Sequence, residues 1–140
     1  MQQQEDLIRE IVRRVMAQAG DPVKQRDIGG AMLIHTASVE TDPFEGRSDV
    51  RLRDLTTLEE APRIGAGLME LLDGADFEWT LTYDEYDYVM EGTLEIVLDS
   101  GTVLVGQPGD VLYIPKDTHI HFRTPQKARY VYFVYPADWQ

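Results

Sequence analysis

Two carboxylates, Glu85 and Asp87, are the strongest candidates in this chain for residues that do chemistry together. They alternate with Tyr86 and Tyr88 in a segment that reads as a strand, so both acids project from the same face. Carboxylates placed this way either raise at least one pKa or share a cation. Their oxygen donors suit Mg²⁺ or Ca²⁺ far better than zinc or iron. Alternatively, these acids belong with Asp84 to a solvated strand end.

The histidines are predicted to lie outside such a site. His119 and His121 flank Ile120 in a predicted strand, and alternation places Ile120 with Phe122 on the apolar face. The two histidines then share the polar, outward face, although a slip of one residue would reverse the two faces. His35 stands alone in the N-terminal region and is interpreted as structural. The chain has no cysteine, which excludes disulfides and thiolate metal sites.

Short β segments separated by turns must position these residues. From about residue 51, such segments alternate with turn signals such as Asp73-Gly74 and Glu91-Gly92. This pattern indicates a sandwich or closed barrel. The predicted strands are Gly65–Leu72, Phe77–Tyr83, Tyr86–Met90, Thr93–Leu98, Thr102–Val105, Asp110–Ile114, His119–Arg123 and Ala128–Tyr135.

The N-terminal segment has a different pattern. Apolar residues recur at helical spacing from Glu5 to Ala19, which predicts an amphipathic helix that ends at Gly20. We therefore divide the chain into a helix at 1–20, a linker at 21–30 and a barrel at 31–140. A short first strand is expected at Ala31–Ala37.

Length and charge restrict the class of protein. A chain of 140 residues fits one core domain, and its formal net charge of −12 disfavours nucleic acids and anionic membranes as partners. It contains no apolar run near the ~20 residues that span a membrane, and no secretory leader. We expect a cytoplasmic protein, with which the absence of cysteine agrees.

Two segments, 83–96 and 109–122, resemble the paired sequence motifs of the cupin family. Glu85 and Gly92 have the spacing of the first motif, and Gly109-Asp110 followed by Pro115 resembles the second. The resemblance implies an all-β cupin, an RmlC-like jelly-roll barrel, with Glu85 and Asp87 facing its lumen. Metal-binding cupins carry histidines where this chain has 78–81 and Ile120. That departure disfavours a dioxygenase or isomerase and a tightly bound transition metal.

Four further stretches, Phe77–Glu85, Val89–Gly92, Ile114–Lys116 and the ending Tyr135–Trp139, together resemble the EutQ family of ethanolamine-utilisation proteins. The resemblance spans roughly residues 30–140. It implies ethanolamine catabolism in association with a bacterial microcompartment. It also implies an acetate kinase that moves a phosphoryl group between acetyl phosphate and ADP, with Mg²⁺ and ATP or ADP as cofactors. The alternative is a non-catalytic binding or assembly protein of the microcompartment.

For the kinase, the candidate catalytic residues are Glu85, Asp87 and Lys116. Glu85 and Asp87 could hold Mg²⁺ directly or through water, while Lys116 could approach a phosphate. A small carboxylate or acyl phosphate is the expected substrate. The candidate substrate-binding residues are Tyr83, Tyr113 and Trp79.

The predicted N-terminal helix has two interpretations. It resembles the short amphipathic peptides that bind microcompartment shell or cargo proteins through an apolar face. Alternatively, it packs on its own barrel or on a second subunit. A homodimer is expected in either case, and the strand at 31–37 could exchange between its subunits.

Overall fold

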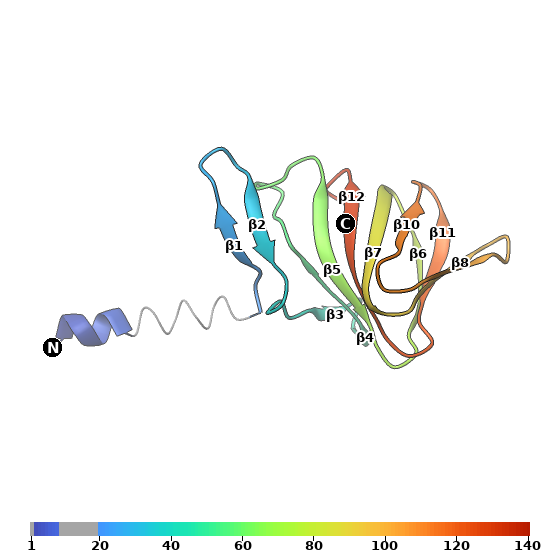
Figure 1. Cartoon of the computed structure of the whole chain (residues 1–140), viewed down its shortest axis with the longest axis horizontal. Coiled ribbons are helices and arrows are strands. Elements are labelled where there is room, and N and C mark those ends of the chain that lie inside the picture. Colours follow the sequence, from blue (N-terminus) through green and yellow to red (C-terminus); the bar gives the residue numbers. More distant parts are fainter. Residues whose placement is uncertain (1, 9–19) are drawn as a thin grey trace. The chain divides into compact units, whose positions relative to one another are not determined.

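The structure is a computed structural model that describes residues 2–8 and 20–140 (Figure 1). The chain forms two compact units, Met1–Glu40 and Thr41–Gln140. Residues 2–8 are helical, and most of the predicted helix, from residue 9 to Ala19, lies outside the described residues. Among those described, no helix has the length and apolar composition that crossing a bilayer requires.

The N-terminal unit contains a β-hairpin. Strand β1 (Val23–Arg26) pairs antiparallel with β2 (Met32–His35). The turn between them is closed by Asp27, whose carboxylate accepts a hydrogen bond from the Gly29 N–H at 2.8 Å. The Asp27 carbonyl accepts a second bond, from the Gly30 N–H at 3.0 Å.

This hairpin corrects the predicted boundaries. Residues 21–30, expected to be a linker, contain β1, and the strand expected at 31–37 belongs to the N-terminal unit, so that the barrel begins at Thr41. The Gly29-Gly30 pair lies in the turn that joins two paired strands, so it connects the two segments instead of separating them. The strand that could have exchanged between subunits is paired within its own chain.

The second unit is built from two antiparallel sheets. One has the order β10-β7-β12-β5-β4-β3 and the other β6-β11-β8-β9. In Figure 1, β5, β12, β7 and β10 lie side by side. The strands are β3 (Asp42–Phe44), β4 (Arg47–Asp54), β5 (Gly65–Leu71), β6 (Asp76–Thr80), β7 (Asp84–Gly92), β8 (Leu94–Leu98), β9 (Val103–Gly106), β10 (Val111–Ile114), β11 (His119–Arg123) and β12 (Ala128–Tyr135).

The predicted all-β barrel is confirmed, and every strand predicted after residue 51 has a counterpart among β5–β12. Strands β3 and β4 were not predicted. In β4 only Val50 and Leu52 are apolar, and both are flanked by charged residues, so the alternation is too short to stand out. Buried apolar side chains from both sheets form one cluster, which includes Leu71, Leu94 and Ile120.

Gly92, the last residue of β7, is a position that only glycine fits without strain. Its φ is +71°, and a Cβ there would overlap the Lys127 carbonyl oxygen. Gly101, in the turn after β8, also has a positive φ, +91°, but a Cβ there would have nothing within 4 Å. Substituting alanine at each position therefore distinguishes two costs. At Gly101 the cost is that of the positive φ alone, and at Gly92 the cost of steric overlap is added.

We expect Gly101→Ala to cost about 1–2 kcal/mol of unfolding free energy, because only the left-handed backbone penalises it. Gly92→Ala should cost at least twice as much, since the Lys127 backbone must also move. Urea unfolding followed by tryptophan fluorescence measures both, because Trp79 and Trp139 both pack in or against the barrel core. Equal losses in the two variants would show that the overlap is relieved without cost.

Candidate functional site

Strand β7 carries the two acids into the interior. Glu85 is 4% exposed and Asp87 is fully buried, whereas Tyr86 and Tyr88, which alternate with them, are exposed. The prediction that both acids share an inward face is therefore confirmed. The alternative, a solvated strand end, is wrong for these two residues and describes only Asp84, which begins the strand and is half-buried.

The neighbours of this acid pair are largely apolar. The register places Glu85 opposite Ile114 of β10 and Val134 of β12. Three carboxylate oxygens are buried without a hydrogen-bond partner in the structure: Oε2 of Glu85 and both Oδ1 and Oδ2 of Asp87. Buried polar atoms are nearly always satisfied, so unpartnered carboxylate oxygens indicate a place for a proton, a water or a cation.

Burial sets the protonation of the pair. It raises the pKa of Glu85 to about 7, from an ordinary value of 4.5. Burial also raises the pKa of Asp87 well above its ordinary value, and the negative charge of Glu85 adds to the effect. Without a cation, the pair therefore retains at least one proton at neutral pH. The oxygen-only donors fit a small, hard divalent cation such as Mg²⁺.

Glu85 lines a small cavity between the two sheets, which is walled mainly by aromatic rings. The cavity has a volume of about 20 Å³. That is enough for an ion or for one or two water molecules. None of its lining residues is a lysine or arginine. The aromatic lining residues are Phe44, Phe77, Trp79, Tyr83, Phe122, Tyr132 and Trp139.

Two of the predicted substrate-binding residues, Trp79 and Tyr83, line this cavity and are hydrogen-bonded to each other. The Trp79 indole Nε1–H donates a hydrogen bond to the Tyr83 hydroxyl at 2.8 Å. Burial, and then the charge of Glu85, raises the pKa of Tyr83 far above its ordinary value. The hydroxyl therefore stays protonated, and its own proton is available to an acceptor in the cavity. Trp79 is only half-buried, so part of its side chain is open to solvent.

Sequence reasoning missed an acid that holds two of the cavity rings in place. The Asp54 carboxylate accepts hydrogen bonds from the Tyr132 hydroxyl at 2.7 Å and from the Trp139 indole at 3.2 Å. These contacts hold the rings of Tyr132 and Trp139, two residues that are distant from β7 in the sequence. The segment ending in Trp139 matches the family pattern. This match indicates that the residue matters, but it does not indicate where in the fold the Trp139 ring lies.

Lys116 and Tyr113 are not among the residues that line the cavity. Tyr113 is 49% exposed on the outer face of β10, where its ring packs against Tyr86 with centroids 4.9 Å apart. Lys116 lies in an exposed turn, where its backbone N–H donates to Asp84 at 2.8 Å. Tyr113 faces outward because its neighbours Leu112 and Ile114 are the inward residues of that strand.

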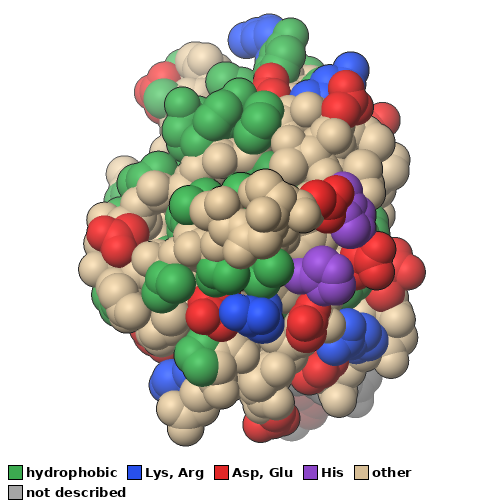
Figure 2. Space-filling model, turned by 90° about the vertical axis from the view of Figure 1, so that its right-hand side faces the viewer, with side chains coloured by type: hydrophobic (Ala, Val, Ile, Leu, Met, Phe, Trp, Pro, Cys, Tyr) green, Lys and Arg blue, Asp and Glu red, His purple; other side chains and the backbone are tan. Residues whose placement is uncertain are grey.

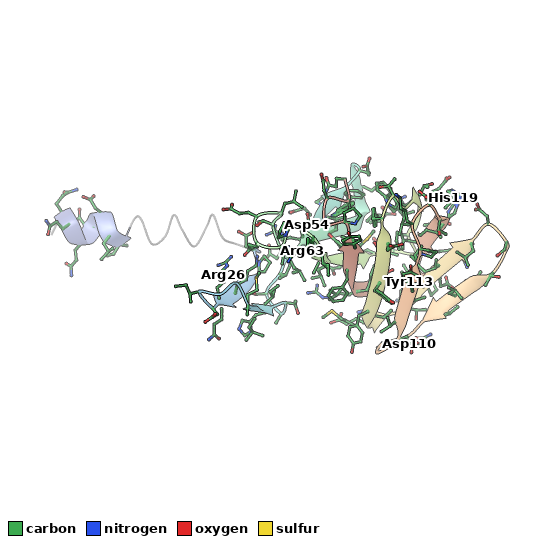
Figure 3. All side chains as sticks on the ribbon, turned by 90° about the horizontal axis from the view of Figure 1, so that it is seen from above. Arg26, Asp54, Arg63, Asp110, Tyr113 and His119 are labelled. Carbon is green, nitrogen blue, oxygen red and sulfur yellow. The ribbon has the colours of Figure 1, made fainter. Side chains whose placement is uncertain are left out.

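The histidines of β11 lie on the outer face, as predicted. The side chains of His119 and His121 are 34% and 37% exposed, while Ile120 between them is fully buried. Figure 3 shows His119 at the periphery of the barrel. Ile120 thus occupies the inward position of this strand, and its aliphatic side chain offers no ligand atom.

The unpartnered acid pair predicts an unusual pH dependence. In EDTA, the Tm of the wild-type barrel should contain a component that falls as pH rises from about 5 to 8. The folded state holds the Glu85 proton up to about pH 7, whereas the unfolded chain releases it near 4.5. Asp87→Asn should remove most of this component and raise the Tm at pH 8 by about 5 °C or more.

The matched control is Glu91→Gln, which changes an exposed acid on the same strand. Its difference in Tm from the wild type should not vary with pH. Thermal unfolding in EDTA at pH 5, 6, 7 and 8 measures all three proteins. A pH profile for Asp87→Asn parallel to that of the wild type would show that the buried pair does not carry the effect.

Comparison with known proteins extends this description. A family described as "Ethanolamine utilisation protein EutQ" matches residues 2–140. A curated protein named "Acetate kinase EutQ" from Clostridioides difficile is 41% identical over 144 residues, covering 96% of this chain and 90% of that protein. One of the same name from Salmonella typhimurium is 41% identical over 80% of this chain. The present chain spans about half the length of the Salmonella protein, 49%.

Solved structures agree with these sequence matches. The structure of the Clostridium difficile EutQ protein superposes with a TM-score of 0.78 at 43% identity, covering 85% of this chain and 98% of that one. An RmlC-like cupin from Shewanella frigidimarina gives a TM-score of 0.61 at 17% identity, over 84% of this chain and 96% of its own. The second likeness concerns the fold alone and confirms that the barrel is a cupin.

Proposed function

Because the chain belongs to the EutQ family of ethanolamine utilisation proteins, we propose that it is an acetate kinase whose reaction takes place at the acid pair of the barrel. The proposal is supported by the name of its relatives and by one observation. Three buried carboxylate oxygens of Glu85 and Asp87 have no partner and are of the donor type that Mg²⁺ prefers. Phosphoryl transfer depends on positioning and on neutralised charge, and a bound Mg²⁺ supplies the latter.

The reaction requires a specific exchange of bonds. An acetate oxygen forms a bond to the γ-phosphorus of ATP, and the bond from that phosphorus to the β,γ-bridging oxygen breaks. The electron pair of the broken bond remains on ADP, and acetyl phosphate is the other product. In this proposal Glu85 and Asp87 hold the cation near the γ-phosphate, and the protonated Tyr83 hydroxyl donates a hydrogen bond to an oxygen of acetate.

The size of the cavity restricts where ATP can lie. About 20 Å³ cannot accept a nucleotide, so the adenosine must remain outside the cavity. Trp79 lines the cavity, is half-buried and already stacks on Phe77, with ring centroids 5.4 Å apart. We place the adenine against Trp79, with only the reacting group inside.

Formation of acetyl phosphate from acetate, ATP and Mg²⁺ tests this proposal. Glu85→Gln and Asp87→Asn should each lower kcat by about 10²-fold or more, because the charge that holds the cation is lost. Trp79→Ala should mainly raise the KM for ATP, since it removes a binding surface. Glu91→Gln should match the wild type. Unchanged activity in both acid variants would overturn the proposed site.

The same cavity size supports a second candidate, a non-catalytic binding protein. Aromatic walls, a buried acid pair and no basic lining residue would retain a small cation without turning over a nucleotide. Wild-type protein that makes no acetyl phosphate, yet is stabilised by Mg²⁺ in a manner that requires Glu85, would favour this candidate over the kinase.

We also propose that the N-terminal helix binds a microcompartment protein. Residues 1–40 form a unit distinct from the barrel, and Leu7 and Ile8 are exposed in the described part of the helix. Residues 20–40 would then serve as the connection between helix and barrel.

Deletion of residues 1–19 should leave the urea unfolding of the barrel unchanged while abolishing co-sedimentation with microcompartment shells. The double variant Leu7→Glu/Ile8→Glu should have the same effect, because only the apolar face is altered. Loss of barrel stability on deletion would show that the helix packs on the barrel, and a loss of dimers would show that it joins subunits. Either result would contradict the targeting proposal.

A further inference from the structure

The outer face of the second sheet carries side chains that could ligate a metal, separate from the acid pair inside. Glu78 lies on β6, and His119 and His121 lie on β11. The register pairs Glu78 with His121, and the two histidines are two residues apart, so all three project to one side. One donor atom from each lies within 4.8 Å of the others. Figure 2 shows two histidines on this face among acidic side chains.

A carboxylate holds each imidazole by its Nδ1 atom. His119 Nδ1 lies 2.6 Å from Asp99, and His121 Nδ1 lies 2.6 Å from Asp76. Metal-binding histidines commonly have such a partner, because it fixes the ring and its tautomer and leaves Nε2 for the metal. The two rings cross at 83° with their centroids 5.9 Å apart. Both histidines are therefore oriented before any ion arrives.

The charges on this face favour a cation. Asp76, Glu78 and Asp99 contribute three carboxylates next to the two imidazoles. Two guanidinium groups lie nearby, and each is bound to a carboxylate outside the cluster: Arg123 to Glu95 at 3.0 Å, and Arg47, which also donates to the Asp76 carbonyl, to Asp49 at 2.8 Å. Imidazole nitrogens favour zinc, nickel or copper over magnesium and calcium. The chemistry of this cluster therefore differs from that of the oxygen-only pair in the barrel.

We propose that Glu78, His119 and His121 bind one divalent transition-metal ion, foremost Zn²⁺, on the outer face of the barrel. Two imidazole nitrogens and one carboxylate oxygen form a three-ligand set that leaves a fourth position to water. The His119 Nε2 atom is 2.7 Å from Glu78 Oε1, the distance of a hydrogen bond. The metal replaces the proton in that bond and holds both atoms at about 2.0–2.2 Å from itself.

The proposed site departs from the expectation drawn from the sequence, which was that the chain holds no tightly bound transition metal. That expectation rested on Ile120, which stands at the position of the cupin histidine. The alternation of β11 that turns Ile120 inward also turns His119 and His121 outward together. The same alternation on β6 turns Glu78 outward beside them.

Calorimetric titration of the EDTA-stripped, full-length chain with Zn²⁺ tests the proposal. We expect one ion per chain, and at least about tenfold weaker binding in His119→Ala, His121→Ala and Glu78→Gln. Asp76→Asn and Asp99→Asn should weaken binding about tenfold or more through loss of ring orientation. Co²⁺ bound in place of Zn²⁺ should give the visible absorption of a tetrahedral site, and this signal should be lost in His121→Ala.

Two control variants test whether Zn²⁺ binds elsewhere on the chain. His35→Ala removes the remaining histidine and should bind Zn²⁺ as the wild type does. Glu85→Gln alters the inner acid pair and should also leave Zn²⁺ binding unchanged, so the result does not depend on the kinase proposal. Three results would each overturn the proposal of a complete site on one chain. They are absence of Zn²⁺ binding, Zn²⁺ binding that survives in both His119→Ala and His121→Ala, and a stoichiometry of one ion per two chains.

Discussion

The desolvation of Glu85 and Asp87 is the constraint on which the site depends. Ionising both carboxyl groups inside an apolar barrel has a high free-energy cost, because water is excluded and their charges repel. A small domain has only about 5–15 kcal/mol of net stability, so an unpartnered acid pair consumes a sizeable share of it. Strongly perturbed carboxyls in a cavity are characteristic of functional sites, where a ligand or cation resolves the unfavourable burial.

The strand pairing around β7 produces that desolvation. β7 lies between β10 and β12, so each inward acid is flanked on both sides by inward residues of its neighbours. Asp87, for example, is opposite Leu112 and Tyr132. A register shift of one residue would bring Tyr86 and Tyr88 inside and expose both acids. Gly92 ends β7 opposite Ala128 of β12 and helps to hold this register, since the backbone of Lys127 leaves no room for a side chain there.

The sequence predicted the fold more completely than the cavity, for a physical reason. Strand and turn patterns are local, so β5–β12 and the inward face of Glu85 and Asp87 could be recognised from neighbouring residues. The aromatic wall is assembled from segments distant in sequence, and nothing local indicates that Trp139 meets Trp79. Tyr113 and Lys116 were expected near the site because they lie within the second motif. The alternation in β10, which turns Tyr113 outward between two inward residues, would have placed Tyr113 correctly.

The strands β6 and β11 give the barrel two chemically different faces. Inward, Phe77, Trp79 and Phe122 wall the cavity; outward, acids and histidines alternate with them. The register that pairs Glu78 with His121 also pairs Trp79 with Ile120. The sheet that contains β6 and β11 therefore separates the histidine nitrogens on its outer face from the acid pair, which projects into the interior from β7 of the other sheet. Hard cations suit the oxygen donors inside, and softer ions suit the imidazoles outside, so the two sites need not compete for the same metal.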